Sequence, residues 1–271
     1  MLAALLIVFR EVLEAGLIIG VTLAATEGVQ RRFLWVTGGI LAGLIGAGVV
    51  ASLAQRLSEA FVGAGQDVFN AAVLIVAVVM LSWHILWMSQ HGREMSANMK
   101  AMGRAVVDGD RTLWAIAVVI AIAILREGSE VVLFLVGIGV EGTEGAWRLW
   151  VGGLGGLVLG AVCSVLLYRG ILAIPARRLF AVTGGLIILL AAGMAGQAAA
   201  FLARANIVSA LGDQLWDSSA ILRDDGIAGR VLHALVGYSD RPMGVQALAY
   251  VTVPVVLFAL SRAITRQQTA S

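Results

Sequence analysis

The chain has 271 residues, of which 60% are hydrophobic and 13% are charged, and its mean hydropathy is +0.94. A soluble domain of this length carries about 25% charged residues, so the composition excludes an ordinary soluble protein and predicts a polytopic membrane protein. The formal net charge of +2 is too small to indicate a nucleic-acid partner. The single cysteine, Cys163, excludes an intrachain disulfide.

Seven apolar stretches are long enough to cross a hydrocarbon core about 30 Å thick as helices. They cover residues 2–25, 36–54, 68–88, 113–138, 149–168, 179–202 and 243–260. Residues 1–9 lack a basic region, and charged residues follow at once, so we interpret the first stretch as a retained span and not a signal peptide. We therefore expect an all-α membrane protein with seven transmembrane helices in a single domain over residues 1–271.

The first and fourth spans contain the same charged pattern, R-E-x-x-E. The two copies lie 116 residues apart and consist of Arg10, Glu11 and Glu14, and of Arg126, Glu127 and Glu130. A charged residue at the centre of a membrane helix costs about 2.5–3.5 kcal/mol, so six unpaired ones would cost on the order of 15–20 kcal/mol. Because the free-energy cost of placing these charges in the membrane is so high, we expect them to have a function there.

The basic residues between the spans predict the orientation. Eleven of them fall on the side that holds the first, third and fifth connections and the C-terminus, and six fall on the other side. Because cytoplasmic loops are enriched in Lys and Arg, we expect the N-terminus outside and the C-terminus inside. Spans one and four are then antiparallel.

Glycine-rich spans follow both motif-bearing spans, with Gly39 and Gly43 in one and Gly152, Gly156 and Gly160 in the other. The pattern predicts a three-plus-three inverted repeat. Repeat one covers about 1–88 and repeat two about 113–202, followed by an outer loop, 203–242, and a seventh helix, 243–260. Such repeats place the substrate near the membrane midplane.

Residues three and four positions apart share one face of a helix, so the two acids of each motif project together beside their Arg. Four carboxylates and two guanidinium groups sum to −2, which suits a hard di- or trivalent cation. Without metal, the Arg residues would hold the carboxylates. The alternative is that each Arg pairs with its own Glu residues to join helices; the surplus of acid favours a cation pathway.

The paired motifs, the seven-span plan and the stretch Trp216-Asp217-Ser218-Ser219 resemble the iron permeases, namely the fungal oxidase-dependent permease and its bacterial EfeU-type relatives. The resemblance implies inward iron transport across the bacterial inner membrane, with iron as substrate and no permanently bound cofactor. It implies that Glu11, Glu14, Glu127 and Glu130 handle iron, that Arg10 and Arg126 support them, and that an external oxidase or periplasmic iron-binding protein is a partner. The family motif is usually R-E-G-L-E, and this chain departs from it at Val12 and Ser129.

Three further acids are candidates for collecting cations on the outer side. Glu141 and Glu144 follow the fourth span, where a solvated turn is the alternative. Asp217 lies in the long outer loop, where the family often carries a D-A-S-E-type motif whose last Glu this chain lacks. Asp217 also suits a helix N-cap before an amphipathic run.

Two other features are interpreted as structural. His84 lies late in the third span between Trp83 and Trp87, so we place it in an interfacial aromatic belt and not among metal ligands. The inner loop has methionines at helical spacing, which favour an interfacial or packing face over a copper site: Met95, Met99 and Met102.

Other functions remain open at this stage. The same carboxylates suit a proton-coupled carrier of manganese or another divalent cation. Four hard carboxylates favour ferric iron, but ferrous iron is not excluded. A membrane enzyme or electron carrier is disfavoured, because only one of three His residues lies in a span and no H-E-x-x-H occurs. A purely structural subunit would not need the charged motifs.

Overall fold

The computed structural model describes residues 1–60, 65–108, 110, 112–140, 145–171, 176–208, 211–224 and 226–270. These residues form helices and connections without a β-strand, apart from one isolated bridge between Gln214 and Met243. The helices are α1 (Leu2–Ala25), α2 (Arg32–Ala60), α3 (Gln66–Val107), α4 (Leu113–Val140), α5 (Ala146–Tyr168), α6 (Ala176–Arg204), α7 (Ile227–Val236) and α8 (Gly244–Ala270).

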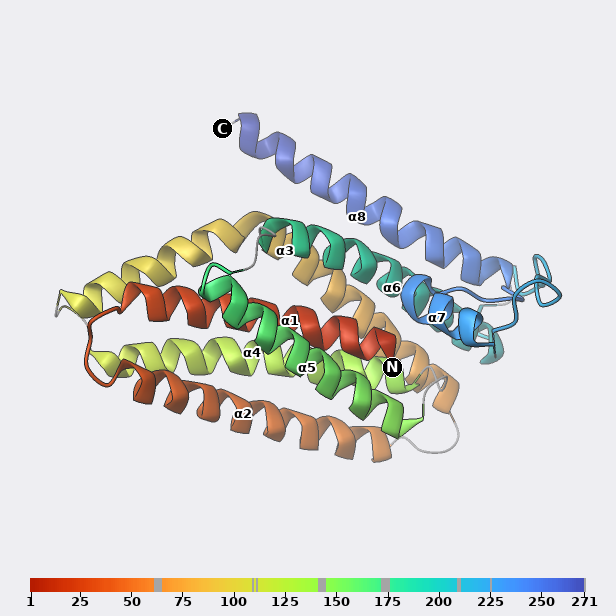
Figure 1. Ribbon diagram of the computed structural model, residues 1–271. Coiled ribbons are helices and arrows are strands. Elements are labelled where there is room, and N and C mark those ends of the chain that lie inside the picture. Colours follow the sequence, from red (N-terminus) through yellow and green to blue (C-terminus); the bar gives the residue numbers. More distant parts are fainter. Residues whose placement is uncertain are drawn as a thin grey trace.

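The long helices run back and forth between two ends of an elongated bundle (Figure 1). We call the end that holds Met1 the N-terminal end; the chain between α6 and α8, with the short helix α7, lies at this end too. Six of the seven apolar stretches expected from the sequence fall within one long helix each, and the seventh, 243–260, begins one residue before α8.

Helix α3 is much longer than the sequence-based span. We expected an inner loop after residue 88, but the helix continues to Val107, for 42 residues in all. The stretch beyond 88 contains no Pro and is rich in good helix formers, so nothing in it ends the helix. Its last turns pack on the end of α1, where a side chain at Gly103 would meet Ala25.

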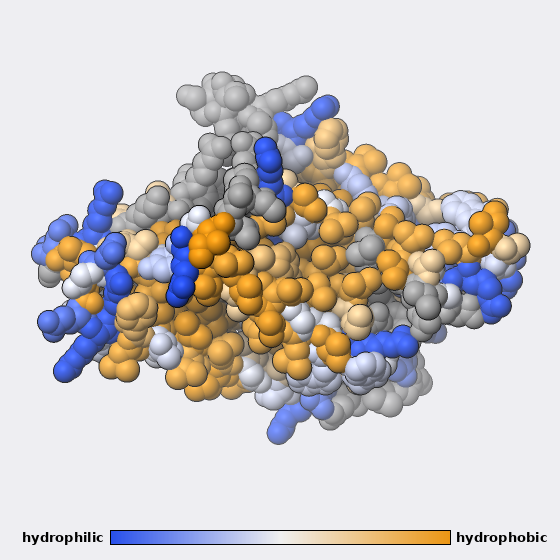
Figure 2. Space-filling model, in the orientation of Figure 1, coloured by the Kyte–Doolittle hydropathy of each residue, from blue (hydrophilic) through white to orange (hydrophobic). Residues whose placement is uncertain are grey.

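Among the residues that the structure describes, five helices are long and apolar enough to cross a membrane, within Arg32–Arg56, Gln66–Met88, Ala146–Tyr168, Arg178–Arg204 and Gly244–Ala263. Helices α1 and α4 have 24 and 28 residues, also sufficient in length, but each carries the three charged residues of its motif. Figure 2 shows apolar side chains over most of the middle of one face and hydrophilic ones mainly toward the ends. The chain is a multi-pass membrane protein.

Two helix pairs make the most extensive contacts: α1 with α5 and α2 with α4. Both depend on glycine, because backbone can approach backbone only where Cβ is missing. A Cβ at Gly156 would lie 2.5 Å from the Leu5 carbonyl oxygen, and a Cβ at Gly39 would lie 2.6 Å from that of Ala117. The glycine-rich helices therefore pack directly on the motif-bearing helices.

This packing explains the departure of the first motif at Val12. On α5, a Cβ at Gly160 would lie 2.8 Å from Cβ of Val12. In the other pair the sizes are exchanged, since a Cβ at Gly128 of the second motif would lie 2.6 Å from Cβ of Ala47 on α2. Each interface thus has one glycine at this level, on the motif helix in one pair and on its partner in the other.

We expect Gly160→Ala to lower the thermal stability of the protein and Val12→Gly to restore it in the double variant. The added methyl group clashes with Val12, and overpacking of this kind costs about 1–3 kcal/mol. With glycine at position 12, the nearest remaining contact is the Phe9 carbonyl oxygen at 3.0 Å. Melting temperatures in detergent for the single and double variants measure the coupling.

Gly153→Ala is the matched control on the same helix, because its Cβ would meet only Val8 Cγ2 at 4.0 Å. A Gly160→Ala variant as stable as this control would show that the α1–α5 contact is looser than described.

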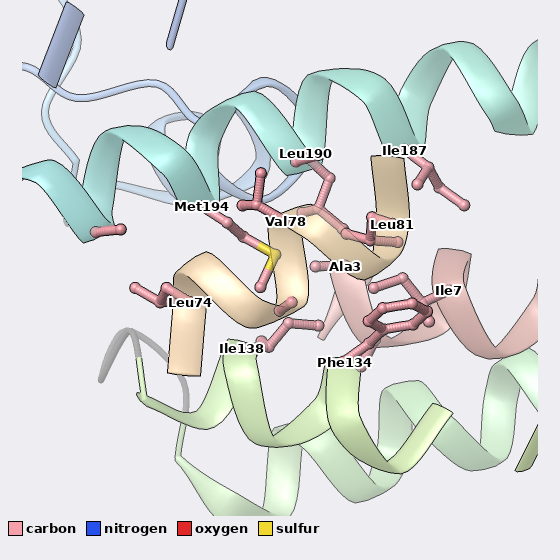
Figure 3. Close-up of a cluster of buried hydrophobic side chains, with 14 of the residues drawn as sticks. Ala3, Ile7, Leu74, Val78, Leu81, Phe134, Ile138, Ile187, Leu190 and Met194 are labelled. Carbon is pink, nitrogen blue, oxygen red and sulfur yellow. The ribbon is translucent and has the colours of Figure 1, made fainter. Parts of the chain in front are cut away.

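Two apolar clusters fill the space between the helices. The larger lies toward the N-terminal end, where Ile7 of α1, Leu81 of α3, Phe134 of α4 and Met194 of α6 pack together (Figure 3). The smaller lies toward the opposite end and joins α1, α2, α4 and the end of α3; its buried members are Ala15, Val36, Val106, Ile116, Ile120 and Ile124. The level between the clusters holds the charged motifs.

Candidate functional site

The first motif is buried on the face of α1 that points into the bundle. Arg10, Glu11 and Glu14 are 4%, 1% and 3% exposed, although they are the only charged residues of that helix. The guanidinium of Arg10 joins the two acids, with one nitrogen 3.1 Å from Oε1 of Glu14 and another 3.6 Å from Oε1 of Glu11. Arg10 and Glu14 are four residues apart and share one face of the helix, which brings their side chains together.

The second motif faces the first from α4, which packs against α1. Glu127 and Glu130 are buried, and Nε of Arg126 donates to Oε1 of Glu130 at 3.1 Å. The guanidinium of Arg126 also lies over the ring of Trp87, 4.3 Å from its centroid. The sequence motifs match, yet the Arg side chains differ: Arg10 is 5% exposed and Arg126 is 34% exposed.

His84 of α3 lies between the two motifs and contacts both. Its Nε2 is 3.1 Å from Oε2 of Glu14 and 4.0 Å from Oε2 of Glu11, and its Nδ1 contacts Oε2 of Glu130. The side chain is 2% exposed. Our interpretation of His84 as part of an interfacial belt is therefore wrong. It treated residue 84 as the end of a span, whereas α3 runs from Gln66 to Val107 and places it well inside the helix.

Four of these side chains offer ligand atoms that all lie within 4.8 Å of one another, namely Glu11, His84, Glu127 and Glu130. Both carboxylate oxygens of Glu11 and Oε2 of Glu127 are buried and have no hydrogen-bond partner. An ionised carboxylate in an apolar interior is costly without a compensating donor or cation. A cluster of three carboxylates and one imidazole, in which several oxygens accept no hydrogen bond, is chemically suited to hold a metal cation.

Apolar layers enclose the charged level on both sides. Ile7 lies one turn before Glu11 and Phe134 one turn after Glu130, both in the larger apolar cluster. Ala15 and Ile124 occupy the corresponding positions on the other side, in the smaller cluster. Electrostatic interactions strengthen in such a low-dielectric setting, so the charged groups at this level interact more strongly with one another than they would at the surface.

Comparison with known proteins gives the family. Residues 1–265 match the family described as the iron permease FTR1 family. The chain belongs to this family. The ferrous iron permease EfeU of Escherichia coli O6:K15:H31 is 28% identical over 247 residues, which are 89% of this chain and 88% of that protein.

Two further relatives have similar coverage. The ferrous iron permease EfeU of Yersinia pestis is 26% identical over 251 residues, 89% of this chain and 86% of its own. The E. coli K12 protein, described as a putative inactive ferrous iron permease EfeU, is 28% identical over 247 residues. No solved structure matches the chain. As a member of a permease family, the protein is an iron permease and not an enzyme.

The second motif departs from the usual family form at Ser129, and the structure shows how the polar group is satisfied. Its hydroxyl donates to the carbonyl oxygen of Leu125 at 2.6 Å, one turn back on α4. Ser and Thr in membrane helices commonly bond the i−4 carbonyl in this way. Ser129 is thus compatible with a membrane helix and takes no part in the cluster of ligand atoms.

The outer candidates lie apart from this cluster. Asp217 is exposed in the connection before α7, where its Oδ2 pairs with Nε of Arg241 at 3.1 Å. Its Oδ1 accepts from the backbone N–H of Ser219 at 2.9 Å. Hydrogen bonds from Ser219, together with Arg241, hold the pKa of Asp217 below its usual value. The expected N-cap is not formed, because α7 begins after Gly226.

The remaining candidates are two acids after α4 and three methionines on the expected inner side. Glu141 and Glu144 lie outside the described residues, as do the side chains of Met95 and Met99. Met102 is half-buried on the extended part of α3, and the helical spacing of the three methionines is accounted for by that helix.

Proposed function

We propose that the protein moves iron ions inward across the bacterial inner membrane through a midplane site formed by both R-E-x-x-E motifs. The observation that carries the proposal is the group of buried carboxylate oxygens at Glu11 and Glu127 that have no hydrogen-bond partner. The four acids of the motifs, with Arg10 and Arg126, leave a formal charge of −2. A divalent or trivalent cation would compensate that charge, and iron is the cargo of the family.

The proposed depth of the site agrees with the lengths of the motif helices. At 1.5 Å per residue, Glu11 lies about 14 Å from the start of α1 and about 21 Å from its end. Glu127 lies about 20 Å from either end of α4. If both helices span the membrane, for seven spans in all, the carboxylates meet near its middle.

The pattern of helix contacts supports an inverted repeat. Exchanging α1 with α4 and α2 with α5 converts the α1–α5 contact into the α4–α2 contact, and these are the two most extensive contacts in the bundle. Each joins a motif helix to a glycine-rich helix. Transporters of this architecture alternate access by moving one repeat against the other around a central site.

The orientation follows from the positive-inside rule, with the N-terminal end of the bundle outside. The connection between α6 and α8, which contains Asp217, then faces the exterior. We propose that an external oxidase or a periplasmic iron-binding protein delivers iron to this side.

Radioactive iron uptake tests the function directly, in cells that lack their own high-affinity iron uptake and express this chain. We expect iron to accumulate above the level of cells with an empty vector, with surface abundance of the protein measured in parallel. Unlabelled manganese in excess should compete weakly. Manganese accumulation without iron accumulation would instead identify a carrier of another divalent cation, and no uptake of either from inserted protein would contradict transport by the chain.

A further inference from the structure

His84 differs from every other residue at the site, because it is an imidazole that contacts acids of both motifs. We propose that His84 is a direct ligand of the transported cation and that Glu14 is its positioning residue. This inference rests on the proposed function, since it assigns parts within the same site. It makes the two R-E-x-x-E motifs unequal in their chemistry although they match in sequence.

The distances divide the acids into two groups. Glu11, Glu127 and Glu130 share with His84 a volume in which all ligand atoms lie within 4.8 Å of one another. Glu14 is not a member of that group. Its Oε2 instead lies 3.1 Å from Nε2 of His84, at hydrogen-bonding distance.

Glu14 is itself held in place. Its other oxygen, Oε1, lies 3.1 Å from the Arg10 guanidinium, whose side chain is 5% exposed. Arg10, Glu14 and His84 thus form a chain of contacts that starts on α1 and ends on α3. With Nε2–H donated to Glu14, the ring is held with Nδ1 facing Glu130 of α4, and Nδ1 becomes a metal ligand when the proton that it shares with that carboxylate is released.

This arrangement is the one that metal-bound histidines adopt in proteins. A ligating imidazole usually donates its second ring N–H to a carboxylate, which fixes the tautomer and raises the basicity of the ligating nitrogen. Here Glu14 takes the part of that carboxylate. Nδ1 of His84 is in direct contact with Oε2 of Glu130, so this nitrogen and that carboxylate meet at the same place in the site.

The imidazole also has a consequence for selectivity. Carboxylates alone suit hard cations such as Ca²⁺ and Mg²⁺, whereas imidazole suits Fe, Zn, Cu and Ni. A site with three carboxylates and one imidazole therefore favours a transition-metal cation over Ca²⁺ and Mg²⁺. His84 would supply this discrimination, which the two motifs by themselves do not.

Pulsed EPR of the purified full chain with Mn²⁺ as the probe tests the ligand assignment without any substitution. A coordinated imidazole gives modulation from its ¹⁴N nuclei, and the pattern should change when the protein is produced with ¹⁵N-labelled histidine. The His84→Gln variant should lose the ¹⁴N signal. The control, His233→Gln, should retain it, because His233 lies on α7, where its Nδ1 contacts the Tyr238 carbonyl oxygen.

Metal titrations with Fe²⁺ and Ca²⁺ test the positioning and the selectivity. Loss of an outer partner of a ligating histidine weakens metal binding about 10- to 100-fold, which is the expected effect of Glu14→Gln on Fe²⁺. Ca²⁺ affinity should change little in His84→Gln, so the preference for Fe²⁺ should fall. In Glu14→Gln the ¹⁴N signal should persist.

The outcomes separate this inference from the proposed function. Wild-type protein that binds and transports iron but shows no histidine-dependent ¹⁴N modulation, or His84→Gln protein with unchanged Fe²⁺ preference, would overturn the ligand assignment alone. Absence of iron uptake by the wild-type chain would overturn the proposed function as well.

Discussion

Iron uptake by cells that express the Glu11→Gln variant is expected to fall to the level of the empty vector. Glu11 is 1% exposed, and neither of its carboxylate oxygens has a hydrogen-bond partner. Gln has nearly the same shape but removes one negative charge from the cluster. Losses of outer partners at metal sites already cost about 10- to 100-fold in affinity, so loss of a direct ligand should exceed that range.

Glu27→Gln is the matched control for this result. Glu27 follows the end of α1, is exposed, and lies beyond the helix that carries the motif. The Glu27→Gln variant removes one negative charge from the chain without changing the cluster, so its iron uptake should remain near the wild-type level. Normal uptake in Glu11→Gln, with equal surface abundance, would contradict the assignment of the buried carboxylates to the iron pathway.

Arg10→Gln is expected to destabilise the protein far more than Arg126→Gln. Arg10 is 5% exposed and contacts Glu11 and Glu14, so its removal leaves two buried carboxylates without their cation. Breaking a buried ion pair by removing one partner costs about 3–5 kcal/mol. Arg126 is 34% exposed, and its contacts with Glu130 and the Trp87 ring are accordingly weaker.

Thermal unfolding in detergent measures this difference, and added Fe²⁺ provides a second comparison. A bound cation supplies the missing positive charge, so Fe²⁺ should raise the melting temperature of Arg10→Gln by more than that of Arg126→Gln. Equal melting temperatures for the two variants would show that the burial difference between the arginines has no energetic consequence.

The sequence was a good guide to elements and a partial guide to the site. Hydropathy located the seven long helices of the described residues, and the repeated motif supplied three of the four side chains whose ligand atoms lie close together. It missed His84, because the end of a hydrophobic stretch was taken as the end of a helix. The helical spacing of Met95, Met99 and Met102 indicates that the helix continues past the span. With that interpretation, His84 would have been placed inside α3.

The sequence also predicted only part of the role of the glycines. Their four-residue spacing predicted close packing of helices, but not which helix each one meets. The pairing of Val12 with Gly160 and of Gly128 with Ala47 depends on the register between helices that are far apart in the sequence. Because of that register, Val12, which departs from the usual motif, lies opposite a glycine that leaves room for its side chain.

The amino-acid sequence by itself determined that this is a membrane protein, that two of its apolar spans contain charged residues, and that acids exceed arginines there. Those properties are local, because hydropathy and helical periodicity depend on neighbouring residues. The tertiary structure decided which side chains meet: His84 between the motifs, Glu14 on its Nε2 and not among the close ligand atoms, and Arg10 buried while Arg126 is not. Such contacts follow from how helices cross and in what register, which depends on the packing of the whole bundle.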